Sequence, residues 1–475
     1  MDTIETLNYG FWKYFKDISS IPRKSGEEEK IAKYLINFAI ERNLKYYSDK
    51  YNNVVIWKEA SPGYEYKEIL GLQCHTDMIC EKRKNIQHDF SKDPLNLIVD
   101  GDYIKATNTT LGADNGIGVA YILAILDSAK ILSPKLECIF TTEEETTMNG
   151  VNYLDASILE SKKIISFDNF SEDEMWISSA TAKEWVSTIT EKRIELNPSN
   201  FSTYTLSLTH FKGGHSGLNI GDNTRGNPIK ICAELLKCFS NIYIANFEGG
   251  TKVNIIPRNC EIQFTISNYE LNKVSTLKEN MKKIQREYPD SDISCYKIDT
   301  ITKCYTNKTS KRLLDFIKTF KNGSINKDDY GNVILSGNFA AVKSENDCIT
   351  ILYSIRHNSN MLGIELEKEI KSNMKQYNIE VQQYTNILGY EQDENGKLIK
   401  ACENLYLKHF NKNIKKVKVQ ACLECGYFSS KIQDLQYIAI APNIYDAHSP
   451  YERMSIKSAN KIWGFVVNLI ENINW

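Results

Sequence analysis

The sequence predicts an α/β fold in which one domain interrupts another, and three observations lead to this prediction. Helical patterns alternate with short apolar strands near both ends of the chain. From about residue 183 the strand patterns change to Thr and Ser alternation and carry no acidic clusters at their ends. From residue 389 the first pattern returns. We therefore predict a main domain over residues 1–182 and 389–475, and an inserted α+β domain over residues 183–388.

The elements of the main domain follow from the spacing of apolar residues. Apolar side chains at helical spacing indicate helices, and short apolar runs that stop abruptly indicate buried strands. Pro22 ends the first helical pattern. The predicted helices cover residues 3–18, 27–42, 111–130, 398–410 and 455–473, and the predicted strands cover residues 54–57, 69–75, 136–142, 163–167 and 436–441.

The inserted domain has an internal order that repeats once. A helix over 229–239, a strand over 260–267 and a helix over 271–288 are echoed by elements over 310–319, 349–355 and 365–377. The two stretches share order without sequence identity. We predict two similar α+β halves, each with a small sheet and helices on one face.

Charge, apolar segments and cysteine content limit the expected partners and location of the protein. Lys plus Arg total 58 against 60 for Asp plus Glu, so no net field attracts nucleic acid or an anionic membrane. A small molecule or a peptide is the expected partner. The first six residues lack the apolar core of a signal peptide, and no window approaches eighteen uncharged apolar residues, so we predict a cytoplasmic protein. The twelve scattered cysteines are typical of reduced thiols, and Cys422 and Cys425 lack further zinc ligands nearby.

Potential metal ligands follow several predicted strands. Residues beyond the carboxyl ends of such strands face the crevice in which α/β proteins bind ligands. The ligand candidates are His75, Asp114, Glu145, Asp168 and His448. Five nitrogen and oxygen ligands suit two divalent ions that share one carboxylate. Asp77 is suited to hold the second ring nitrogen of His75, and Glu144 is left as an unliganded general base.

Several motifs resemble the bacterial aminoacyl-histidine dipeptidases, also called cytosol non-specific dipeptidases. This family belongs to a di-zinc peptidase clan that includes carnosinase and carboxypeptidase G. The motifs occur in the family's order from near residue 70 to the C-terminus, and they are Gln73-Cys74-His75-Thr76-Asp77-Met78, Gly112-Ala113-Asp114-Asn115-Gly116-Ile117-Gly118, Thr141-Thr142-Glu143-Glu144-Glu145, Lys212-Gly213-Gly214-His215-Ser216-Gly217, Leu423-Glu424-Cys425-Gly426 and Ala447-His448-Ser449-Pro450.

The resemblance implies a specific role for each of these residues. His75 and Asp168 would hold one ion, Glu145 and His448 the other, and Asp114 would bridge them. The ions would be zinc, with manganese and cobalt as alternatives. Asp77 would orient His75, and Glu144 would take the proton from a water that bridges the ions. The family also implies a cis peptide bond between Asp114 and Asn115. The chain departs from the family at Cys74, Thr76 and Glu143, none of which is a ligand.

The resemblance also assigns residues outside the metal set. His215 would stabilise the tetrahedral oxyanion, and Asn254 and Arg356 would hold substrate from a lid formed by the inserted domain. Gly426, in the main domain, would bind substrate as well. Because the insertion is long, we expect His215 to serve its own chain through lid closure about residues 182 and 388. A homodimer is compatible with this expectation but dispensable for the chemistry. His88, His210, His357 and His409 are predicted to be structural or solvent-facing.

Three alternatives remain open at this point. The first is an aminoacylase or carboxypeptidase of the same clan that acts on N-acyl amino acids. The second is a serine hydrolase with Ser216 as nucleophile, although the G-x-S-x-G spacing is absent. The third is a non-catalytic metal or peptide binder, which would have no need of a base at Glu144. The predicted activity is the metal-dependent hydrolysis of dipeptides, including carnosine and other Xaa-His dipeptides.

Overall fold

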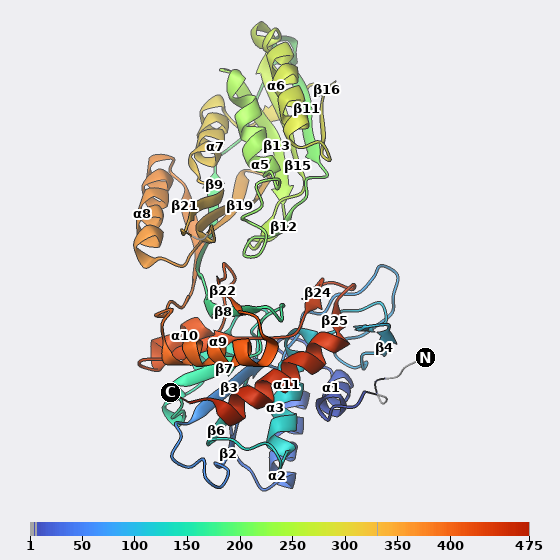
Figure 1. The fold of residues 1–475 in the computed structure, drawn as a ribbon. Helices are drawn as coiled ribbons and strands as arrows, with labels where there is room; N and C mark the ends of the chain where they lie inside the picture. The colour runs from blue at the N-terminus through green and yellow to red at the C-terminus, as the bar shows by residue number, and fades with distance from the viewer. Residues whose placement is uncertain (1–3, 5–6, 330, 475) are drawn as a thin grey trace. The chain divides into compact units, whose positions relative to one another are not determined.

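The chain forms two compact units in a computed structural model, which describes residue 4 and residues 7–329 and 331–474. The first unit comprises the chain up to Ser178, Tyr390–Val417 and the chain from Leu423 onward. The second unit comprises Ser179–Gly389 and Lys418–Cys422. Figure 1 labels many of the helices and strands of both units. The α/β fold class predicted from the sequence is confirmed, since both units combine sheets with helices.

A mixed sheet organises the first unit, and its neighbouring strands follow the order β1-β2-β6-β3-β7-β23-β8-β22. The four strands β6, β3, β7 and β23 run parallel to one another. The carboxyl ends of these four strands therefore lie along one edge of the sheet. The bounds are β1 Lys45–Ser48, β2 Val54–Lys58, β3 Leu70–His75, β6 Leu136–Thr141, β7 Lys163–Ser166, β8 Glu174–Ser178, β22 Lys415–Lys418 and β23 Gln436–Ala439.

Helices and a smaller sheet complete the first unit. The smaller sheet has the order β24-β25-β5-β4, with β4 Leu97–Asp100, β5 Tyr103–Ala106, β24 Ile444–Tyr445 and β25 Arg453–Ser455. The helices are α1 Phe11–Ser19, α2 Glu29–Glu41, α3 Ala113–Asp127, α4 Asn149–Tyr153, η2 Ala156–Ile158, α9 Lys397–Phe410, α10 Cys425–Lys431 and α11 Ile456–Asn472. Helices α1, α2, α3, α9 and α11 share one hydrophobic core with the central strands.

The first helix is shorter than predicted. Apolar spacing predicts a helix over residues 3–18, but α1 begins at Phe11. Gly10 directly precedes it, and glycine is unfavourable inside a helix. Residues 3, 5 and 6 of the predicted helix lie outside the described residues.

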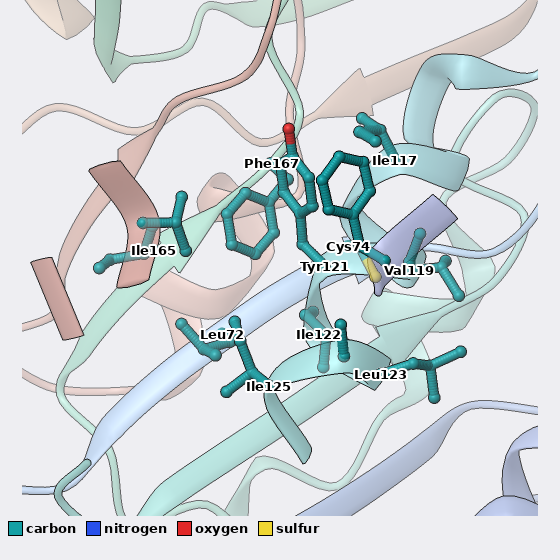
Figure 2. Packing of buried hydrophobic residues seen from close by; sticks show 14 of the residues in the cluster. Leu72, Cys74, Ile117, Val119, Tyr121, Ile122, Leu123, Ile125, Ile165 and Phe167 are labelled. Atoms are coloured by element: carbon teal, nitrogen blue, oxygen red, sulfur yellow. The ribbon is translucent and has the colours of Figure 1, made fainter. Parts of the chain in front are cut away.

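Helix α3 packs against β3 and β7 through side chains that are fully buried. Figure 2 shows Val119 and Tyr121 of α3 beside Cys74 and Phe167. Cys74 is therefore a small core residue. The close approach requires glycine at residue 118, because a Cβ there would lie 2.8 Å from the Cβ atoms of both Cys74 and Phe167.

Gly118→Ala is expected to destabilise the protein by about 1–3 kcal/mol, because the added methyl group overpacks the contact between α3 and β3. The measurement is urea unfolding followed by circular dichroism. Gly464→Ala in α11 is the matched control, since the nearest atom to its Cβ would be His409 Nε2 at 3.9 Å. This control should be neutral or stabilising by up to about 1 kcal/mol. Equal stability of Gly118→Ala and wild type would contradict the packing argument.

One antiparallel sheet with nine strands organises the second unit, in the order β16-β11-β15-β13-β19-β20-β9-β21, with β18 also paired to β19. The bounds are β9 Thr181–Thr190, β11 Phe201–Thr209, β13 Ile242–Gly250, β15 Cys260–Ser267, β16 Asp292–Ile298, β18 Gly323–Lys327, β19 Val333–Glu345, β20 Cys348–His357 and β21 Glu380–Ile387. The short strands are β10 Ile194–Glu195, β12 Gly214–His215, β14 Ile255–Ile256 and β17 Lys303–Cys304. The helices are η3 Pro198–Asn200, α5 Pro228–Leu235, η4 Leu236–Cys238, η5 Asn268–Glu270, α6 Lys273–Glu287, α7 Asn307–Thr319 and α8 Asn360–Gln376.

The two predicted halves of the inserted domain share a single sheet instead of forming two small sheets. The join is the antiparallel pairing of β13 with β19, in which Gly250 lies opposite Ala341. Gly250 has a φ of 69°, and a Cβ there would lie 1.8 Å from the carbonyl oxygen of Ala340, so glycine permits the close pairing. The helix predicted over 229–239 also ends early, with α5 stopping at Leu235 and a 3₁₀ turn following.

No helix in the described part of the chain is long and apolar enough to cross a lipid bilayer.

Candidate metal centre

The predicted ligands of the first unit lie at the carboxyl ends of its parallel strands. His75 is the last residue of β3, Glu145 follows β6, and Asp168 lies two residues after the end of β7. His448 lies between β24 and β25, in the segment that follows β23. Asp114 lies in the first turn of α3, and its peptide bond to Asn115 is cis, as the family resemblance predicts.

Asp114 lies between two histidines and offers one carboxylate oxygen to each. Its Oδ1 is 3.1 Å from Nε2 of His75, and its Oδ2 is 3.0 Å from Nε2 of His448. The same His448 nitrogen is 3.0 Å from Oε1 of Glu145. Two ligand atoms of a tetrahedral zinc ion lie about 3.3 Å apart, so these separations are close to those of a coordination shell.

The electrostatics of the cluster favour a cation. Desolvation and the neighbouring Asp168 carboxylate raise the pKa of Glu144 well above its usual range. Desolvation and Asp114 do the same for the pKa of Asp168. Burial also raises the pKa of Glu145, although its Oε1 lies 3.0 Å from His448. Divalent ions would offset this concentration of negative charge, so the donor set fits a metal site.

Two groups of side chains within the described residues have ligand atoms close enough to share a metal ion. One consists of His75, Asp114 and Glu145, and the other of His75, Glu144 and Asp168. Within each group the ligand atoms lie within 4.8 Å of one another. His75 belongs to both groups, so the centre is one continuous cluster.

Asp77 supports both His75 and the acidic triplet. Its Oδ1 is 3.4 Å from Nδ1 of His75, and its carboxylate accepts hydrogen bonds from the backbone N–H groups of Glu144 and Glu145 at 3.1 Å. Burial alone would raise the pKa of Asp77, but the interaction with His75 lowers it. A charged Asp77 fixes the His75 ring with Nε2 directed at Asp114.

The second unit brings two of its predicted site residues together. Strand β12 pairs with β14, so His215 lies opposite Ile255, the neighbour of Asn254. The carbonyl oxygen of Asn254 accepts a hydrogen bond from the N–H of Ser216 at 2.8 Å. The N–H of Gly217 donates to Nδ1 of His215 at 3.2 Å, so the neutral ring carries its proton on Nε2.

Arg356 and Gly426 occupy different units. Arg356 is buried in β20, and its Nη1 donates to the carbonyl oxygen of Gln420 at 3.2 Å and to Sγ of Cys422 at 3.1 Å. Gly426 lies in α10 of the first unit. All twelve cysteines are free thiols, Cys425 among them.

The serine-hydrolase alternative finds no support in the geometry of Ser216. Its hydroxyl is buried and has no hydrogen-bond partner among the described residues. None of the described residues is therefore placed as a base that would activate it as a nucleophile.

The histidines without a motif differ in exposure. His210 and His409 are exposed and His88 is half-buried, whereas His357 is buried and desolvation lowers its pKa to about 4.

Sequence reasoning assigned no role to several buried charged residues around the centre. Glu424 accepts hydrogen bonds from Gln73 at 2.5 Å and Thr141 at 2.6 Å, and desolvation raises its pKa to about 7. Glu452 and Arg23 contact the backbone of the ligand-bearing loops. Glu424 lies within a recognised motif and Glu452 lies just after another, so each had a signal in the sequence. Arg23 had none, because it follows a helix rather than a strand.

The fold and this centre together define a peptidase class. The profile of peptidase family M20/M25/M40 matches residues 71–472, and the chain belongs to this family. The resemblance inferred from the motifs is confirmed, and the chain is a peptidase.

Two relatives cover nearly the whole chain. The cytosol non-specific dipeptidase of Escherichia coli is 29% identical over 474 residues, which are 97% of this chain and 97% of that protein. The crystal structure of aminoacylhistidine dipeptidase from Vibrio alginolyticus is 28% identical, has a TM-score of 0.86, and the match covers 100% of this chain and 98% of that one. Human carnosine dipeptidase 1 shares the fold at 10% identity, with a TM-score of 0.52 and coverage of 98% and 96%.

Proposed function

We propose that this peptidase hydrolyses unblocked dipeptides, Xaa-His dipeptides such as carnosine among them, with two divalent metal ions. The observation that carries the proposal is the position of Asp114, whose two oxygens lie 3.1 and 3.0 Å from two different histidines. The dipeptidase names of the two full-length relatives support the substrate class. The E. coli relative's name also supports the predicted cytoplasmic location.

Each residue of the centre has a proposed role. His75 and Asp168 would hold one ion, Glu145 and His448 would hold the other, and Asp114 would be shared between them. Zinc is the expected metal, with manganese and cobalt as alternatives. When bound, the ions polarise the substrate carbonyl and lower the pKa of water. Glu144 accepts the proton of the attacking water, and Asp77 keeps the His75 ring oriented.

Residues outside the metal set bind the rest of the substrate. The guanidinium of Arg356 is suited to donate two parallel hydrogen bonds to the terminal carboxylate of a dipeptide. Asn254 and Gly426 are proposed to contact the substrate as well. His215 carries its proton on Nε2 when neutral, which suits donation to the oxyanion of the tetrahedral intermediate.

The proposed function is tested by metal analysis of the purified protein combined with hydrolysis of a substrate panel. The panel contains carnosine, other unblocked dipeptides and the matching N-acyl amino acids. We expect two equivalents of divalent metal, hydrolysis of the dipeptides, and loss of activity with a chelator but not with a serine-directed acylating agent. Faster hydrolysis of the N-acyl compounds would favour an aminoacylase or carboxypeptidase instead.

His215→Ala is expected to lower kcat by about 10²–10³-fold with metal content unchanged, as for loss of one oxyanion donor. His210→Ala is the matched control, because His210 is exposed and lies in the same stretch of chain. Its kinetics should match those of wild type. A lower metal content in His215→Ala would contradict the assigned role.

Subunit mixing tests the expectation that His215 serves its own chain. Inactive Glu144→Gln and inactive His215→Ala are mixed under conditions that exchange subunits. We expect no recovery of activity. Recovery toward a quarter or a half of wild-type activity would show that His215 works in the partner's site.

A further inference from the structure

Glu452 is a buried carboxylate that binds the backbone of the loop leading to Asp114. Its Oε2 accepts the N–H groups of Leu111 at 2.8 Å and Gly112 at 2.9 Å. Its Oε1 accepts the N–H groups of Ala113 at 2.9 Å and Asp114 at 3.4 Å. Glu452 is 2% exposed, so these four N–H groups take the place of water around its carboxylate. The hydrogen bonds join the segment that carries His448 to the segment that carries Asp114.

Arg23 binds the same loop from its carbonyl side. Its Nη2 donates to the carbonyl oxygen of Gly112 at 2.5 Å, while its Nη1 donates to those of Thr76 and Asp77 at 3.1 Å. A Cβ at residue 112 would lie 2.4 Å from Nη2 of Arg23, so glycine is needed beside the guanidinium. Arg23 therefore joins the segment after His75 to the loop that carries Asp114.

We propose that Glu452 and Arg23 are positioning residues that fix Asp114 between His75 and His448. Three ligand-bearing segments come from distant parts of the chain, and these two side chains hydrogen-bond across them. Neither residue is a proposed ligand or touches the reacting atoms. The inference rests on the proposed function, because it assigns these contacts to the assembly of the metal centre.

If Glu452 only stabilised the fold, its substitution would not affect metal binding specifically. Glu137 is a buried glutamate suited to this comparison. Glu137 is also buried in the first unit, and its carboxylate accepts the N–H groups of Glu160 and Ser161 at 2.8 Å and Nε1 of Trp57 at 3.0 Å. It lies at the opposite end of β6 from the acidic triplet. A Glu→Gln change at either residue removes acceptors from backbone N–H groups, but only Glu452 contacts the metal-binding loop.

The test compares zinc affinity of Glu452→Gln and Glu137→Gln by competition with a chromophoric chelator. Glutamine keeps the shape of glutamate but offers one acceptor oxygen and turns an NH₂ group toward N–H donors that the carboxylate accepted. Both variants should lose thermal stability. Only Glu452→Gln should bind zinc more weakly, by about 10- to 100-fold, as is usual when a residue supporting metal ligands is changed.

Arg23→Lys is the second variant, because an ammonium cannot reproduce the planar fork that reaches three carbonyl groups. It should also weaken zinc binding, and it keeps the inference testable if Glu452→Gln does not fold. Wild-type zinc affinity in either folded variant, or an equal loss in Glu137→Gln, overturns the inference while the proposed function stands. Wild-type protein that binds no divalent metal overturns both.

Discussion

Asp114→Ala should leave the protein without bound divalent metal and without peptidase activity. The two oxygens of Asp114 face two different histidines, so its removal takes a ligand from both proposed ions at once. The remaining acidic side chains, Glu144, Glu145 and Asp168, would then repel one another without a shared centre. The measurement is metal content after dialysis, together with the change in melting temperature on adding zinc. Wild type should be stabilised by zinc and the variant should not.

Two further variants sharpen this test. Asp114→Asn keeps the size of the side chain but offers a single acceptor oxygen, so it should retain at most one ion. Asp100→Ala removes an exposed carboxylate of β4 that pairs with Lys105, and should bind two ions as wild type does. Retention of two equivalents by Asp114→Ala would show that Asp114 does not bridge the ions.

Glu144→Gln is expected to keep both metals and to lower kcat by about 10²–10⁴-fold, the usual contribution of a general base. The amide cannot accept the proton of the attacking water. The backbone should be undisturbed, because the Glu144 N–H still donates to Asp77. The measurements are metal analysis and steady-state hydrolysis of carnosine.

The neighbouring Glu143→Gln is the matched control. The Glu143 side chain accepts hydrogen bonds from Thr147 and Asn149 and belongs to neither potential metal group. Its activity should stay near that of wild type. Loss of one metal ion from Glu144→Gln would instead assign Glu144 as a ligand, consistent with its grouping with His75 and Asp168. Full metal content with near-normal turnover would contradict any role for Glu144 as base.

Much of the first unit is determined by local patterns in the sequence. A short, mostly apolar run indicates a buried strand, and the change to the polar residues His75, Thr76 and Asp77 marks its end. The same reasoning finds Asp168 after β7. In the second unit, the predicted strand over residues 260–267 coincides with β15, whose β-branched and aromatic residues lie between Asn259 and Asn268.

The tertiary structure alone decides which strand ends become neighbours. The order β6-β3-β7-β23 follows from pairing between distant segments, and no spacing within the sequence contains that information. The same is true of the pairing of β13 with β19, which makes one sheet where two were predicted.

The supporting residues of the centre show the physical reason most clearly. Glu452 accepts hydrogen bonds from residues 338 to 341 positions earlier in the chain, and Arg23 binds carbonyl groups of two separate loops. The spacing of apolar residues indicates which face of a helix or strand is buried. It does not indicate which backbone groups a buried charged side chain will bind. The sequence by itself therefore determined the ligand types and their strand ends, whereas the folded chain decided how Asp114 is held between its two histidines.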